Sequence, residues 1–122
     1  MAEIHSYMEA LMMSEEDPIL FENGQVVFSA GERGSEMYIV RTGSVDLRIG
    51  DTLLETVRPG GILGELALVD AAPRSATAVA GPDCSLVAIR EETFRNLVKQ
   101  VPGFSLEVMR VMARRLRQSN AS

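Results

Sequence analysis

The sequence has few of the residues from which disulfides, metal sites and nucleophilic centres are built. Among its 122 residues Cys84 is the one cysteine, so no disulfide forms within the chain. His5 is the one histidine, which leaves no cluster for a zinc site. Because no second histidine exists to activate its thiol, Cys84 is expected to be a small buried strand residue. We therefore expect no catalytic residue, no metal and no cofactor, and so not an enzyme.

Long hydrophobic runs and an excess of positive charge are also missing. No apolar run approaches the roughly 18 residues that span a bilayer. The start, Met1-Ala2-Glu3, lacks the basic residues of a secretory signal. The formal net charge of −5 argues against nucleic acid or an acidic membrane surface as the main partner. We expect a cytoplasmic protein with no membrane insertion and no nucleic-acid partner.

The composition, with 46% hydrophobic and 24% charged residues, is that of one globular domain over residues 1–122. An N-terminal segment, 1–18, contains a helix over 2–13, whose apolar residues are spaced by three and four. Short runs bounded by glycines then predict strands over 19–22, 25–30, 37–42, 44–49, 52–57, 75–80 and 84–89. Short strands at this spacing predict a mainly β fold, an antiparallel roll of the jelly-roll type over 19–90.

Two helices are expected after the roll, within residues 91–118. The first, over 91–101, has Phe94, Leu97 and Val98 on one side, and Pro102-Gly103 ends it. The second, over 104–118, has an apolar stripe with arginines facing away from it. The stripe consists of Val108, Met109, Val111, Met112 and Leu116, and the arginines are Arg110, Arg114 and Arg117.

Residues 63–78 read LGELALVDAAPRSATA and have the outline of a small anion site. Gly64 removes a side chain where the backbone must come close to another group. The residues after it favour a short helix, so the N–H groups of Leu66 and Ala67 would point outward and attract phosphate. An ordinary turn glycine followed by the first-turn acid Glu65 explains the helix start equally well without a ligand.

Arg74 makes the anion site the better interpretation. Pro73 stops the helix, so the Arg74 guanidinium, the Ser75 hydroxyl and the Ala76 amide lie where a strand begins and can converge on one phosphate. The planar fork of arginine binds two phosphate oxygens at once. The Glu65 carboxylate would repel phosphate but accepts hydrogen bonds from hydroxyls such as a ribose 2′-OH. Phosphate and ribose together predict a nucleotide.

The stretch GELALVDAAPRSATA resembles the phosphate-binding cassette of the cyclic nucleotide-binding domain family, and residues 28–49, FSAGERGSEMYIVRTGSVDLRI, resemble the front half of that fold. The resemblance implies that Glu65 binds the ribose and Arg74 the cyclic phosphate, with Ser75, Ala76 and the backbone of Leu66 and Ala67 completing the phosphate shell. Leu63 departs from the family's usual aromatic residue but still fills an apolar position. The implied ligand-binding residues are Leu63, Gly64, Glu65, Leu66, Ala67, Arg74, Ser75 and Ala76.

In this family the C-terminal helix swings onto the base when the ligand binds. The resemblance therefore makes Met112, Arg115 and Leu116 candidates for capping the base, and Arg115 can stack its guanidinium on a purine. A helix that stays packed on the roll in every state is the alternative. We expect a sensor without an effector domain, with cyclic AMP slightly favoured over cyclic GMP, and an effector protein or a second copy as partner of the C-terminal helix. The other interpretation is a module that binds no nucleotide and serves protein interaction or dimerisation.

Overall fold

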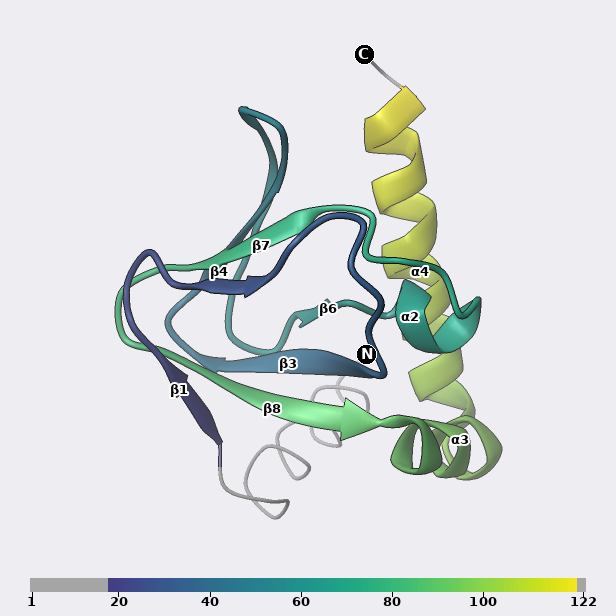
Figure 1. Ribbon diagram of the computed structural model, residues 1–122. Helices are drawn as coiled ribbons and strands as arrows, with labels where there is room; N and C mark the ends of the chain where they lie inside the picture. Colours follow the sequence, from purple (N-terminus) through teal and green to yellow (C-terminus); the bar gives the residue numbers. More distant parts are fainter. Residues whose placement is uncertain (1–17, 121–122) are drawn as a thin grey trace.

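The computed structural model describes residues 18–120, with side chains up to Gln118, so the helix expected over 2–13 and His5 lie outside the described residues. Figure 1 shows two layers of strands with helices at one end of them. The strands are β1 (Ile19–Phe21), β2 (Val26–Phe28), β3 (Glu36–Thr42), β4 (Val45–Ile49), β5 (Thr52–Val57), β6 (Ile62–Leu63), β7 (Thr77–Ala80) and β8 (Cys84–Arg90). The helices are α2 (Leu66–Val69), α3 (Glu91–Gln100) and α4 (Pro102–Asn120).

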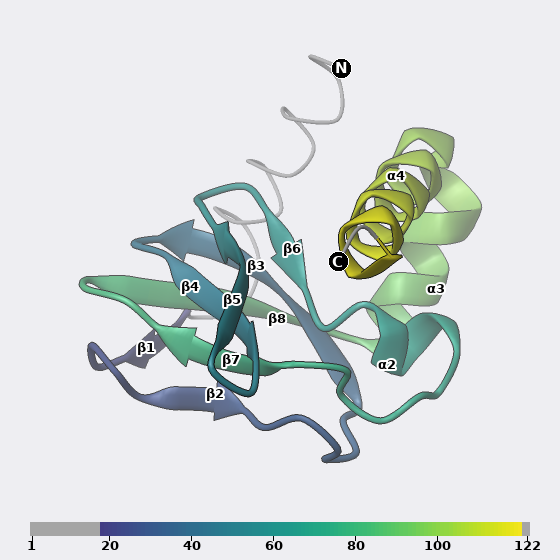
Figure 2. The same ribbon diagram turned by 90° about the horizontal axis from the view of Figure 1, so that it is seen from above.

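The strands form two four-stranded antiparallel sheets, in the orders β1-β8-β3-β6 and β2-β7-β4-β5. Strands that are neighbours in a sheet are mostly distant in the sequence, as in a roll. Figures 1 and 2 both place α2, α3 and α4 at the same end of the roll. The predicted antiparallel roll with flanking helices is confirmed.

Strand β3 separates two hydrophobic clusters because successive side chains of a strand point to opposite faces. Met37 and Ile39 face the helices, whereas Tyr38 and Val40 face the inside of the roll. The helix-side cluster consists of Met37, Ile39, Ile62, Ile89, Phe94, Leu97, Phe104, Val108 and Val111. The roll cluster consists of Phe28, Tyr38, Val40, Val45, Leu47, Val57, Leu63, Ala78, Ala80, Cys84 and Leu86. The continuous apolar run in β3 is therefore buried on both faces.

Several boundaries differ from the prediction. Strand β6 was not predicted, because it is a pair of residues between glycines. Strand β7 begins at Thr77, two residues later than expected. Helix α4 begins at Pro102, since proline at the first helical position lacks only an N–H that would have no partner within the helix.

The apolar stripe expected on α4 is only partly buried. Val108 and Val111 lie in the helix-side cluster, whereas Met109 and Leu116 are 56% and 63% exposed. On α3, Val98 is likewise exposed although Phe94 and Leu97 are buried. The packed face of each helix is thus narrower than the apolar face that the sequence presents.

Cys84 is buried in β8, as expected, and burial raises the pKa of its thiol. Within residues 18–120 no helix is long and apolar enough to cross a membrane. The same residues contain no group of histidine, cysteine and acidic side chains that could hold a metal ion.

Candidate functional site

The predicted cassette, residues 63–78, runs from the end of strand β6 through a turn at Gly64, the short helix α2 and a loop to the start of strand β7. Gly64 has φ +79°, and a Cβ there would lie 2.6 Å from Nη1 of Arg74. A Cβ at Gly34, on the other side of the guanidinium, would also collide with Arg74. The close approach predicted for Gly64 is confirmed, and the group that approaches is the Arg74 side chain.

Arg74 is a buried cation that lacks an anionic partner among the residues that the structure describes. The residue is 7% exposed, and its Nη1 donates one hydrogen bond, 3.2 Å long, to the Gly64 carbonyl. Its guanidinium carbon lies 4.2 Å from the centre of the Phe28 ring and 5.9 Å from that of Tyr38. No carboxylate among residues 18–118 forms a salt bridge with it. Burying an unpaired charge is costly, so this position suits a side chain that receives an anion.

Arg74 faces a small cavity of about 40 Å³. Seven of the eight predicted ligand-binding residues line it, namely Gly64, Glu65, Leu66, Ala67, Arg74, Ser75 and Ala76. Leu63 is absent from the lining because its side chain is buried in the roll cluster, where it is paired with Tyr38 across the sheet. The fold therefore brings together the groups that the sequence analysis assigned to the phosphate and the ribose.

The two backbone amides expected to face an anion, those of Leu66 and Ala67, differ in their hydrogen bonding. The Ala67 N–H donates a long hydrogen bond of 3.3 Å to the Gly64 carbonyl, whereas the Leu66 N–H has no partner in the described part of the chain. The next two amides, of Leu68 and Val69, both donate to the Glu65 carbonyl at 3.0 Å. The Leu66 amide is thus the donor of α2 that a ligand would find open.

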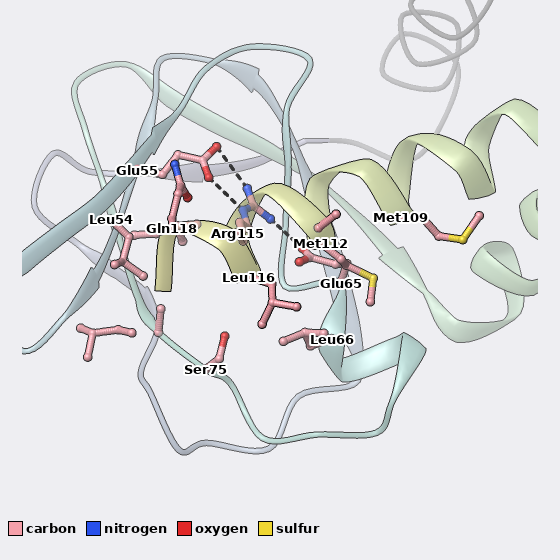
Figure 3. A pocket seen from close by; sticks show the side chains of 14 residues that line it. Leu54, Glu55, Glu65, Leu66, Ser75, Met109, Met112, Arg115, Leu116 and Gln118 are labelled. Carbon is pink, nitrogen blue, oxygen red and sulfur yellow. Dashed lines mark hydrogen bonds and ion pairs between the residues drawn. The ribbon is translucent and has the colours of Figure 1, made fainter. Parts of the chain in front are cut away.

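Glu65 is 4% exposed, and its carboxylate is bound by a guanidinium from α4. Nη1 of Arg115 donates to Oε1 of Glu65 at 2.8 Å, and Nη2 donates to the Ile62 carbonyl at 2.7 Å. Nε of Arg115 donates to Oε1 of Glu55 at 2.9 Å (Figure 3). All three nitrogens of Arg115 are therefore engaged, and the residue bridges α4, β5, β6 and the cassette.

Glu55, on β5, is a charged site residue that the sequence analysis did not identify. Nη2 of Arg114 also donates to its Oε2, at 3.2 Å. Burial by itself raises the pKa of Glu55, but the hydrogen bonds and charges of Arg115 and Arg114 outweigh it and leave the pKa below its ordinary value. For Arg115, burial lowers the pKa, yet the hydrogen bond that it donates to Glu55 and the charges of Glu65 and Glu55 hold it above its ordinary value. Glu55 shares one face of its strand with Val57, and an acidic residue on an inward face was the available signal.

A larger cavity of about 490 Å³ lies between strands β4 and β5 and helix α4 (Figure 3). All three candidates for capping a base, Met112, Arg115 and Leu116, line it. The remaining lining residues are Leu47, Ile49, Leu54, Glu55, Glu65, Leu66, Ser75, Ala76, Met109, Ala113 and Gln118. Its volume lies in the range of about 300–1,000 Å³ that is usual for small-molecule pockets. Because Glu65, Leu66, Ser75, Ala76 and Arg115 line both cavities, the two adjoin.

The chain is similar to proteins that carry cyclic nucleotide-binding domains. It is 37% identical over 95 residues to the cAMP-dependent protein kinase regulatory subunit of Eremothecium gossypii, a match that covers 78% of this chain and 21% of that protein. It is 31% identical over 118 residues to the CRP-like cAMP-activated global transcriptional regulator of Mycobacterium tuberculosis, covering 91% of this chain and 52% of that protein. The chain thus spans between a fifth and about half of these relatives.

A solved structure and a family model agree with these relatives. The Thermus thermophilus catabolite activator protein superposes with a TM-score of 0.77 at 31% identity, covering 94% of this chain and 56% of that one. The family model of the cyclic nucleotide-binding domain matches residues 18–101, which include the roll, the cassette and α3. The chain therefore belongs to the cyclic nucleotide-binding domain family.

Proposed function

We propose that this domain binds a cyclic nucleotide, with Arg74 on the cyclic phosphate and Glu65 on the ribose. The observation that carries the proposal is the buried Arg74 guanidinium, which has no carboxylate partner among the described residues and borders a cavity with Ser75 and Ala76. A singly charged phosphodiester would supply the missing anion. Family membership supports the same ligand class.

The phosphate would occupy the small cavity. Arg74 offers its guanidinium fork from one side, and the open Leu66 amide and the Ser75 hydroxyl offer donors from the cassette. Charge-assisted hydrogen bonds of this kind each contribute about 1.5–3 kcal/mol. The chain has a net charge of −5, so these local donors, not the overall field, must attract the anion.

The ribose would meet Glu65. Oε1 of Glu65 already accepts a hydrogen bond from Arg115, but a carboxylate has about four acceptor positions on its two oxygens, so a 2′-hydroxyl can bind beside the guanidinium. Glu65 would then contact the nucleotide and α4 at the same time. We propose that this shared carboxylate transmits binding to α4, whose movement is the signal.

The base would lie in the larger cavity, against the apolar side chains of β4, β5 and α4. Met112 and Leu116 are the residues best placed to cover it, since the nitrogens of Arg115 are engaged in ion pairs and a carbonyl hydrogen bond. We propose cyclic AMP as the slightly favoured ligand, because the names of both relatives refer to cAMP. The role is one of binding, since the polar groups around the cavities are hydrogen-bond donors and paired carboxylates.

A thermal-shift titration with cyclic AMP, cyclic GMP and the matching non-cyclic monophosphates tests this proposal. Binding to the native state should raise the melting temperature once the concentration exceeds the dissociation constant, by the equivalent of about 2.7 kcal/mol at a hundredfold excess. We expect the cyclic nucleotides to act and the monophosphates to act weakly. No shift at millimolar cyclic nucleotide would contradict the proposal and favour a module that serves only protein interaction or dimerisation.

A further inference from the structure

Helix α4 is held to the rest of the domain in two different ways along its length. Its first half contributes Phe104, Val108 and Val111 to the helix-side cluster. Beyond Val111 no side chain of α4 up to Gln118 is fully buried, and Met112 and Arg115 are the half-buried residues of this part. The second half of α4 lies over the larger cavity and is therefore held by few apolar contacts.

Both arginines of this second half that pair with the roll, Arg114 and Arg115, contact Glu55, and Arg115 also donates to Glu65 and to the Ile62 carbonyl. The Glu55 carboxylate accepts from Arg115 with both oxygens, at 2.9 and 3.4 Å, and from Arg114 at 3.2 Å. Its side chain is 17% exposed and that of Arg115 is 18% exposed, so the pair is screened less by solvent than an ordinary surface salt bridge. On β5, Glu55 is paired with the buried Leu47 of β4, within the sheet that forms one wall of the cavity.

We propose that Glu55 is a positioning residue that holds Arg115, and with it the second half of α4, over the nucleotide cavity before any nucleotide is bound. Arg115 is then fixed beside Glu65, so the carboxylate assigned to the ribose is kept in place from the opposite side of the cavity. The effect on nucleotide affinity rests on the function proposed above, whereas the effect on α4 does not.

The position in which Glu55 holds α4 is the one that can accept a nucleotide. With α4 in this place the cavity still measures about 490 Å³, which is ample for a molecule of nucleotide size. Releasing the helix would reduce the fraction of molecules in the binding-competent arrangement, and the apparent affinity falls by that fraction. The nucleotide should also leave faster when the helix that covers it is no longer tied to β5.

Hydrogen exchange on the nucleotide-free protein tests whether Glu55 holds the second half of α4 in place. In Glu55→Gln, which keeps the shape of the side chain and removes its charge, we expect backbone amides of residues 112–118 to exchange about tenfold faster, with residues 104–111 unchanged. Asp46→Asn is the matched control, because Asp46 is an acidic residue of the neighbouring strand that pairs with Thr56 and Arg48, not with α4. High salt should accelerate exchange of residues 112–118 more in the wild type than in Glu55→Gln, which keeps the ion pair of Arg115 with Glu65. Equal exchange in wild type and Glu55→Gln would overturn the proposal.

Stopped-flow measurement of cyclic AMP dissociation tests the effect on binding. We expect Glu55→Gln to dissociate about tenfold faster, equivalent to about 1.4 kcal/mol, with a nearly unchanged association rate. Glu55→Asp, which keeps the charge on a shorter side chain, should have a dissociation rate between those of the wild type and Glu55→Gln. This variant replaces Glu55→Gln in the test if Glu55→Gln folds poorly. If the wild type binds no nucleotide, the proposed function fails while the exchange experiment still decides the role of Glu55. If the wild type binds and Glu55→Gln dissociates at the wild-type rate, the role of Glu55 in binding fails alone.

Discussion

Replacing Arg74 by alanine should separate nucleotide binding from folding. The backbone of Arg74 would keep its place, because its N–H donates to the Glu32 carbonyl and its carbonyl accepts from the Gly31 N–H, both at 2.7 Å. The side chain contributes ring contacts with Phe28 and Tyr38, worth about 0.5–2 kcal/mol, and its removal also relieves the burial of an unpaired charge. We therefore expect the free energy of unfolding without ligand to change by less than about 2 kcal/mol.

The effect on affinity should be much larger. Two charge-assisted bonds from the guanidinium to phosphate oxygens contribute about 3–6 kcal/mol together. Water enters the space left by the side chain and replaces part of this binding free energy. We therefore take the lower end of the range, about 3 kcal/mol, which corresponds to a loss of affinity of about a hundredfold. Isothermal titration calorimetry with cyclic AMP measures this loss directly.

Two variants serve as controls for this experiment. Arg74→Lys keeps the charge without the planar fork and should lose less affinity than Arg74→Ala. Arg48→Ala removes a half-buried arginine that pairs with Asp46 at 3.7 Å, and it should bind as the wild type does. Unchanged affinity for both cyclic AMP and cyclic GMP in Arg74→Ala would refute the assignment of the phosphate to this residue.

Three further predictions concern the cassette and its surroundings. Gly64→Ala should lower the free energy of unfolding by about 1–2 kcal/mol because of its positive φ, and should also weaken nucleotide binding because the added Cβ displaces Arg74. Gly24→Ala, at φ +87° in open space, should lower the free energy of unfolding alone. Chemical denaturation measures the first effect and calorimetry the second. Glu65→Gln should reduce the preference for cyclic AMP over its 2′-deoxy analogue in calorimetry, and an unchanged preference would remove Glu65 from the ribose. Burial, together with the hydrogen bond and charge of Glu36, raises the pKa of Tyr38 to about 12 against the opposing charge of Arg74. Because the unfolded chain then loses this proton at a lower pH than the folded one, the free energy of unfolding should fall as the pH rises from about 10 to 12. Tyr38→Phe should flatten this slope in denaturation curves.

Most of the fold could be predicted because the residues that begin and end its strands are marked by local sequence patterns. Glycines at turns, such as Gly31 and Gly43 with φ +88° and +74°, bound the apolar runs of the strands, and a period of two marks the alternating faces. The pair Ile62–Leu63 could not be predicted as a strand, since two residues carry no periodicity and their partner β3 is more than twenty residues away. The partial exposure of α4 was also beyond sequence reasoning, because the packed width of a helix depends on the surface that it meets.

In the candidate site, too, the groups close together in the sequence could be predicted, and those brought together by tertiary packing could not. Residues from Gly64 to Ala76 lie within one short stretch, so their types and spacing were sufficient to predict that their groups lie together around one cavity. The ion pairs of Arg115 with Glu65 and Glu55 join residues 50 and 60 positions apart, and only the packing of α4 on the roll brings them together. Glu55 shares a strand face with the buried Val57, but its partners are known only once the helix that carries them is placed.

The most direct test of the central claim is a crystal structure of the protein with cyclic AMP. We predict one phosphate oxygen or more within hydrogen-bond distance of the Arg74 guanidinium, the ribose 2′-hydroxyl on the Glu65 carboxylate and the base against Met112 or Leu116. A nucleotide bound elsewhere, with Arg74 still facing an empty cavity, would contradict it.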